Sequence, residues 1–91
     1  MADNYTVTIT LVANNRPCHA GHTIGEQWTY DGMTPGGMCG SAWHTVYPWA
    51  MMMAAGGAFE WQEDPDVMRL SCPDCEVQNI FELRRTRRSS G

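Results

Sequence analysis

A chain of 91 residues makes one domain, with a hydrophobic core only just large enough to fold without further support. It carries ten acidic residues against six arginines, has no lysine, and has a formal net charge of −4. Residues 1–83 contain all ten acidic residues and two arginines, a formal charge of −8, which would repel a phosphate backbone. We therefore do not expect the chain to bind nucleic acid.

Two segments in the first third have the alternation of half-buried β-strands. From Tyr5 to Ala13, apolar side chains occupy one face and threonines occupy the other. Such β-branched residues fit the pleated surface of a sheet. The shorter segment from Glu26 to Tyr30 alternates in the same way and ends at the turn formed by Asp31-Gly32. Both segments are predicted strands.

The run from Met38 to Gly57 has the clearest helical character. We expect the helix to start near Gly40 or Ser41, with the Ser41 hydroxyl as N-cap, and to end at Gly56-Gly57. Pro48 lies inside it and predicts a kink or a one-turn break, because proline removes an intrahelical hydrogen bond. Side chains at helical spacing form an apolar stripe of Trp43, Val46, Tyr47, Ala50 and Ala54.

After the helix, the sequence predicts a final pair of strands, Val67 to Cys72 and Val77 to Arg85. The predicted order is ββαββ, an α+β fold in which a small antiparallel sheet packs on one Pro-kinked helix. We assign residues 1–86 to this single domain and 87–91 to a flexible basic C-terminal tail.

The segment after Met1 is polar and lacks the features of a signal peptide, and the longest apolar run is too short to cross a bilayer. We therefore expect a cytoplasmic protein with no membrane partner. In a reducing compartment, four cysteines indicate thiols or metal ligands rather than disulfides.

Potential metal ligands fall in three places: Cys18, His19 and His22; Cys39 and His44; Cys72 and Cys75. A closed zinc site can be drawn from the two local chelates Cys18-x3-His22 and Cys72-x2-Cys75. An open site can be drawn from Cys18, His22, Cys39 and Cys72, with a zinc or iron ion and one position left for water or substrate. The open site uses the cysteine that the closed site leaves out.

Cys39 offers a further possibility that needs no metal. It lies at the expected N-terminal end of the helix, where partial positive charge stabilises a thiolate. His22 or His44 would then serve as the base, with Cys39 as nucleophile or acid/base. Free cysteines are also common as small buried residues, so Cys39 and Cys72 could instead be structural.

The methionine run Met51-Met52-Met53 is unusual for so short a helix. Three consecutive residues span about 200° of a helix, so at least one must meet solvent, a ligand or another subunit. Methionine adapts to irregular surfaces, and Trp49, Phe59 and Trp61 lie nearby in the sequence. We expect a homo-oligomer through this Met/Trp surface, with a small-molecule ligand or the acidic turn 60–66 as the alternative cover.

Several separated segments carry a resemblance: Cys18-His19-Ala20-Gly21-His22, Pro35-Gly36-Gly37-Met38-Cys39, Cys72-Pro73-Asp74 and Phe81-Glu82-Leu83-Arg84-Arg85. With this pattern the chain resembles a family of small microbial proteins of similar length. The resemblance implies that Cys18, His22, Cys39 and Cys72 belong together. The family does not generally have a cysteine at the position of Cys75, which favours the open site over the closed one. The resemblance brings no reaction with it.

We therefore predict a small cytoplasmic protein with a Cys/His-rich site at the helix N-terminus. Its metal ligands would be Cys18, His22, Cys39 and Cys72, holding zinc or iron. Catalysis on a small molecule stays open, with Cys39 and His44 as the candidate catalytic residues. Two alternatives remain: a metal-free small-molecule enzyme that uses Cys39, and a non-catalytic oligomeric interaction module with structural cysteines.

Overall fold

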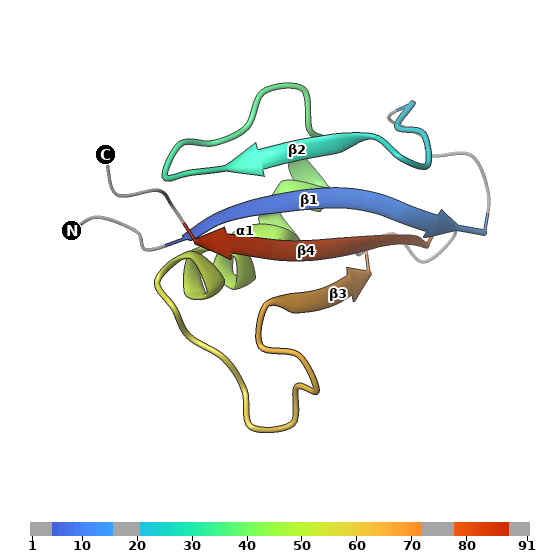
Figure 1. Cartoon of the computed structure of the whole chain (residues 1–91). Coiled ribbons are helices and arrows are strands. Elements are labelled where there is room, and N and C mark those ends of the chain that lie inside the picture. Colours follow the sequence, from blue (N-terminus) through green and yellow to red (C-terminus); the bar gives the residue numbers. More distant parts are fainter. Residues whose placement is uncertain (1–4, 16–20, 72–77, 88–91) are drawn as a thin grey trace.

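The computed structural model describes residues 5–15, 21–71 and 78–87. These residues form a four-stranded antiparallel sheet of order β2-β1-β4-β3, with one helix packed against one face (Figure 1). The elements are β1 (Tyr5–Asn14), β2 (Gln27–Tyr30), α1 (Gly40–Ala54), β3 (Val67–Ser71) and β4 (Asn79–Arg87). The predicted α+β class and ββαββ order are confirmed.

The alternation of β1 sets the two faces of the sheet. Val7, Ile9 and Leu11 are fully buried on the face that packs against α1, while the threonines between them lie on the opposite face. A bulge between Leu11 and Ala13 shifts the register against β4, and the strand then continues to Asn14. The central position of β1 explains why these three apolar side chains have no exposed surface.

The neighbouring strands place their own apolar residues beside those of β1. Trp28 pairs with Ile9 on one side and Leu83 pairs with Ile9 on the other, and all three side chains are buried. At the edge, Met68 of β3 pairs with Leu83 and is also buried. The core is therefore one layer of side chains between the sheet and α1.

The buried face of α1 differs in part from the predicted stripe. Val46, Ala50 and Ala54 are buried as expected, and Ala42 and Met53 join them. Trp43 is half-buried and Tyr47 is 40% exposed. The alanines let the helix approach the sheet closely, so the two large aromatic rings lie at the flank of α1 instead, next to Tyr30 of β2 at ring-centroid distances of 5.7 and 6.0 Å.

The ends of α1 correct one prediction and confirm another. The N-cap residue is Cys39 rather than Ser41, and no side chain of the described residues caps the helix. The first turn closes through the Trp43 N–H, which donates to the Cys39 carbonyl. The helix then runs past Pro48 without a one-turn break. It ends as predicted at Gly56-Gly57, where Gly56 has a positive φ of 92°. Within the described residues, no helix is long and apolar enough to span a membrane.

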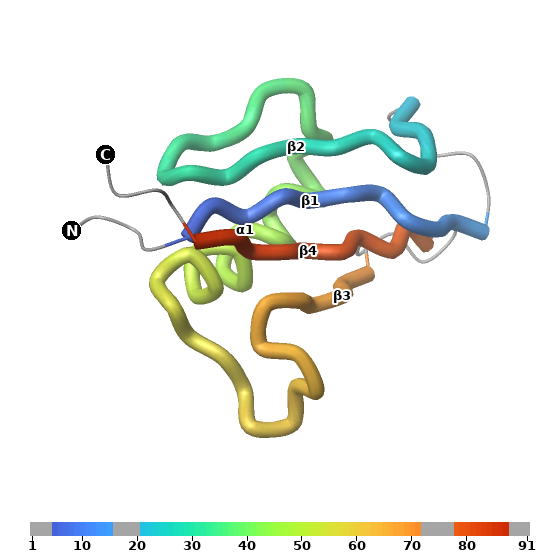
Figure 2. The backbone as a smooth tube through the Cα atoms, viewed as in Figure 1, coloured from blue at the N-terminus to red at the C-terminus, as the bar shows by residue number. Residues whose placement is uncertain are grey.

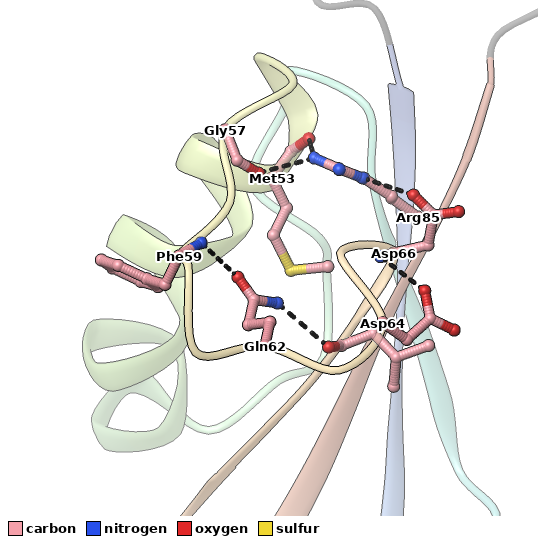
Figure 3. A network of polar contacts seen from close by, with 8 residues as sticks. Met53, Gly57, Phe59, Gln62, Asp64, Asp66 and Arg85 are labelled. Atoms are coloured by element: carbon pink, nitrogen blue, oxygen red, sulfur yellow. Dashed lines mark hydrogen bonds and ion pairs between the residues drawn. The ribbon is translucent and has the colours of Figure 1, made fainter.

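The last strand reaches further than expected. β4 extends to Arg87, so one residue assigned to the tail belongs to the sheet, whereas residues 88–91 lie outside the described part. Arg85 follows Phe81 and Leu83 on the inner face and is buried. Its guanidinium donates to the carbonyls of Met53 and Gly57 and to the Asp66 carboxylate (Figure 3). The backbone between α1 and β3 extends away from the sheet and returns to it (Figure 2). Arg85 contacts this segment near its start, at Met53 and Gly57, and near its end, at Asp66.

Candidate functional site

Two of the four predicted metal ligands meet at the N-terminal end of α1. The Cys39 backbone N–H donates to Nε2 of His22 at 2.9 Å, although 17 positions separate the two residues. Cys39 is half-buried against the core and is a free thiol, and His22 is 8% exposed. The contact with the imidazole is made by the backbone of Cys39, at the N-cap residue of α1.

His22 is held from its other side by Glu26. Oε1 of Glu26 lies 3.4 Å from Nδ1 of His22 and also accepts the Thr23 N–H at 3.2 Å. The ring packs edge-on against Trp28 at a centroid distance of 4.8 Å. The turn that carries His22 is fixed to β1, because Gly25 donates to the Leu11 carbonyl at 2.8 Å and Leu11 donates to the Glu26 carbonyl at 3.0 Å.

These contacts define which nitrogen of His22 carries the proton. Nε2 accepts the Cys39 N–H with its lone pair, so it carries no proton, and Nδ1 is the protonated nitrogen that faces Glu26. The Glu26 carboxylate therefore lies on one side of the His22 imidazole, and the Cys39 backbone at the start of α1 lies on the other. Such an arrangement fits either an oriented histidine ligand or an oriented histidine base.

The other predicted site residues are not part of this contact. His44 is exposed on α1, and within the described residues no hydrogen bond or ion pair ties it to Cys39 or His22. Cys18, Cys72, His19 and Cys75 lie outside the described residues. Among residues 5–15, 21–71 and 78–87, no three His, Cys, Asp or Glu side chains are arranged to hold a metal ion.

The described residues that flank Cys18 and Cys72 lie at the same end of the sheet as His22. Asn15 Oδ1 accepts the Gln78 N–H at 2.8 Å, which joins the end of β1 to the start of β4. Ser71, which directly precedes Cys72, pairs with Ile80. Asn79 is 3% exposed, and its Oδ1 has no hydrogen-bond partner in the described part of the chain. The interior at this end of the sheet therefore contains a polar side chain, that of Asn79.

Sequence reasoning missed two features of the molecule. Glu26 was not assigned to the site, although its spacing of four residues from His22 was a possible signal. The other feature is a cavity of about 410 Å³ between α1, residues 61–64 and β3, whose lining includes Leu70, two positions before Cys72. The sequence did suggest a small-molecule ligand at the Met/Trp surface with Trp49 and Trp61, but it did not indicate that β3 and Glu63 complete the lining.

Searches of protein-family models, curated proteins and solved structures find no match to this chain.

Proposed function

We propose that this chain binds a zinc or iron ion through Cys18, His22, Cys39 and Cys72. The observation that carries the proposal is the contact between His22 and Cys39, which joins two potential ligands from separate loops. The flanking residues add support, because Asn15 and Ser71 lead into the segments with Cys18 and Cys72 from one end of the sheet. Two thiolates and an imidazole make a typical set of zinc ligands, and a third thiolate completes four.

Glu26 and His22 fit the outer part of such a site. Metal-bound histidines usually donate their second ring N–H to a carboxylate, which fixes the tautomer and the ring orientation. Glu26 stands at Nδ1, leaving Nε2 as the nitrogen with a lone pair. To bind a metal, Nε2 would have to release the Cys39 N–H and bind the ion instead.

A bound zinc or iron ion would supply Lewis acidity to a water or substrate heteroatom. The chain's residues would do the rest. Cys39 and His22 would position the ion at the start of α1, Glu26 would hold the imidazole, and Trp28 would shield the ring from solvent on one side. Asn79 Oδ1 is buried and has no hydrogen-bond partner among the described residues, so it could accept a hydrogen bond from a group held in this region.

Metal content tests the proposal directly. Chain purified without chelator and without an affinity tag should contain close to one ion, measured by plasma mass spectrometry. After exchange with cobalt(II), thiolate-to-metal absorption should appear, and Cys39→Ser should weaken it. A chain that binds no zinc, iron or cobalt when its thiols are fully reduced would rule the proposal out.

A second candidate function has its own observation. Cys39 is the N-cap of α1, and its backbone contacts the Glu26–His22 pair. If Nε2 exchanged the Cys39 N–H for the thiol proton, the imidazole would act as the base for a thiol nucleophile without a metal. For this function, metal-free chain should react with iodoacetamide faster at Cys39 than free cysteine does. His22→Gln preserves an acceptor for the Cys39 N–H but removes the base, so it should slow alkylation. If Cys39 reacts no faster than free cysteine, this second candidate fails.

A further inference from the structure

The cavity of about 410 Å³ is lined by none of the four proposed metal ligands. Its size falls in the range of small-molecule sites. Met68 and Leu70 of β3 form apolar parts of its lining together with Val67, and Trp49 of α1 and Trp61 of the following loop add aromatic surface. Most of this lining is carbon.

The two tryptophans are joined by Phe59. The Phe59 and Trp61 rings stack at 4.9 Å with an interplanar angle of 8°, and Phe59 meets Trp49 edge-on at 5.5 Å. Because Phe59 covers one face of the Trp61 indole, Trp61 gives the cavity its other face or its edge. Trp61 is nevertheless 73% exposed, which is a large apolar surface to leave in water.

The loop that carries this aromatic surface is held in place by polar contacts (Figure 3). The Gln62 side chain accepts the Phe59 N–H at 2.7 Å and donates to the Val67 carbonyl at 3.2 Å. Asp66 is tied to Arg85 at 2.9 Å. The cavity wall is therefore organised before any ligand arrives, which lowers the entropy cost of binding.

The charges around the cavity favour a cation. Glu63 lines it, and within the described residues no ion pair or hydrogen bond occupies its carboxylate. Asp64 also lines it, with Oδ1 accepting the Asp66 N–H. Arg69 of β3 also lines the cavity. It alternates with Met68 and Leu70, so its guanidinium is directed to the other face of the sheet, where it lies 3.9 Å from Glu82.

We propose that this cavity binds a small organic cation, an ammonium group with apolar substituents. Aromatic faces attract cations through their quadrupole, and alkylated ammonium ions are recognised by aromatic surfaces next to carboxylates. The apolar substituents would cover Val67, Met68 and Leu70, while the charge would lie between the indoles and Glu63. The formal net charge of −4 draws cations toward the chain.

The test is a titration of the full chain followed by the indole N–H signals of its four tryptophans in NMR spectra. The probes are tetramethylammonium, choline and benzyltrimethylammonium, with 3,3-dimethylbutan-1-ol as the uncharged match of choline. The Trp49 and Trp61 signals should shift saturably, those of Trp28 and Trp43 should not, and affinity should rise with apolar size. Choline should bind more tightly than the alcohol.

Two pairs of variants separate the contributions. Trp61→Ala should weaken benzyltrimethylammonium binding by about 2- to 30-fold, and Trp61→Phe should restore part of it. Glu63→Gln should weaken binding by about fivefold. Glu60→Gln removes the same charge from an exposed neighbour outside the cavity lining and should have a smaller effect.

Three results would overturn the proposal. The first is that no probe shifts the Trp49 and Trp61 signals in a correctly folded chain. The second is that choline and the alcohol bind equally, which would make the cavity an apolar site without charge preference. The third is that the two signals shift with protein concentration and ignore the probes, which would assign this surface to a second copy of the chain.

Discussion

Arg85 donates from Nη1 to the backbone carbonyl of Met53 at 3.0 Å, so the last strand of the sheet holds the last turn of the helix. The same nitrogen donates to the Gly57 carbonyl at 2.7 Å, and the guanidinium lies 4.6 Å from the centroid of the Tyr5 ring. The buried Arg85 side chain of β4 thus contacts the first residue of β1 as well as the segment that joins α1 to β3.

Arg85→Lys should lower the free energy of unfolding by about 2–3 kcal/mol. A lysine ammonium lacks the planar fork that serves Met53, Gly57 and Asp66 together, so buried acceptors lose partners. Urea unfolding followed by tryptophan fluorescence measures the change. Arg84→Lys is the control, because the Arg84 side chain is 58% exposed, and it should change stability by less than about 0.5 kcal/mol. Equal losses in the two variants would contradict this role for Arg85.

Glu26→Ala should reduce zinc affinity by about 10- to 100-fold if the proposed metal site is correct. The carboxylate faces Nδ1 of His22, and without it the imidazole loses its orientation. Competition with a chromophoric chelator measures the affinity. Glu60→Ala removes an exposed acid elsewhere and should leave affinity unchanged. If the two variants bind zinc equally well, Glu26 has no part in the site.

Cys75→Ser should keep the fold and the bound metal, because the open site does not use Cys75. Metal content per chain and the far-ultraviolet circular dichroism spectrum provide the two measurements. Cys39→Ser is the matched comparison, since it makes the same chemical change at a proposed ligand. Loss of metal from the Cys75 variant alone would restore the closed site with the Cys72-x2-Cys75 chelate.

Self-association through the Met/Trp surface remains a prediction. Met51 is 45% exposed, Met52 is half-buried and Met53 is fully buried, so Met51 is the methionine of this run that is most available to a second copy. Light scattering at tens of micromolar should give a mass above that of one 10.2 kDa chain. Met51→Glu should split the assembly, whereas Met33→Glu, at a 75% exposed loop position, should not. A stable monomer would end this prediction.

The elements that the sequence predicted best are those with a strong local pattern. Val7, Ile9 and Leu11 alternate with threonine in a way that only a half-buried strand explains, and Gly56-Gly57 marks the helix end. The helix face was harder to predict, because Tyr47 fits the apolar spacing as well as Met53 does. The tertiary structure decided between them: alanines pack under α1, and the large ring lies beside Tyr30.

The candidate site depends on contacts that no local pattern encodes. His22 and Cys39 meet only because β2 returns antiparallel to β1 and the following loop crosses back to the start of α1. The buried role of Arg85 was hidden by its neighbours, because a run of arginines has the composition of a solvated tail. Its period-two spacing from Phe81 and Leu83 was the opposing signal, and burial followed that spacing.

The contacts of Val67 have a consequence for how copies of this chain can meet. β3 is an edge strand, and such edges can recruit strands from other molecules and start aggregation. At Val67 the N–H donates to the Asp64 carbonyl and the carbonyl accepts from Gln62, both at 3.2 Å, so neither group is available to an incoming strand. Residues 62–64 thus prevent another strand from pairing with β3 at Val67. Any association between copies would then have to begin elsewhere than at this end of β3.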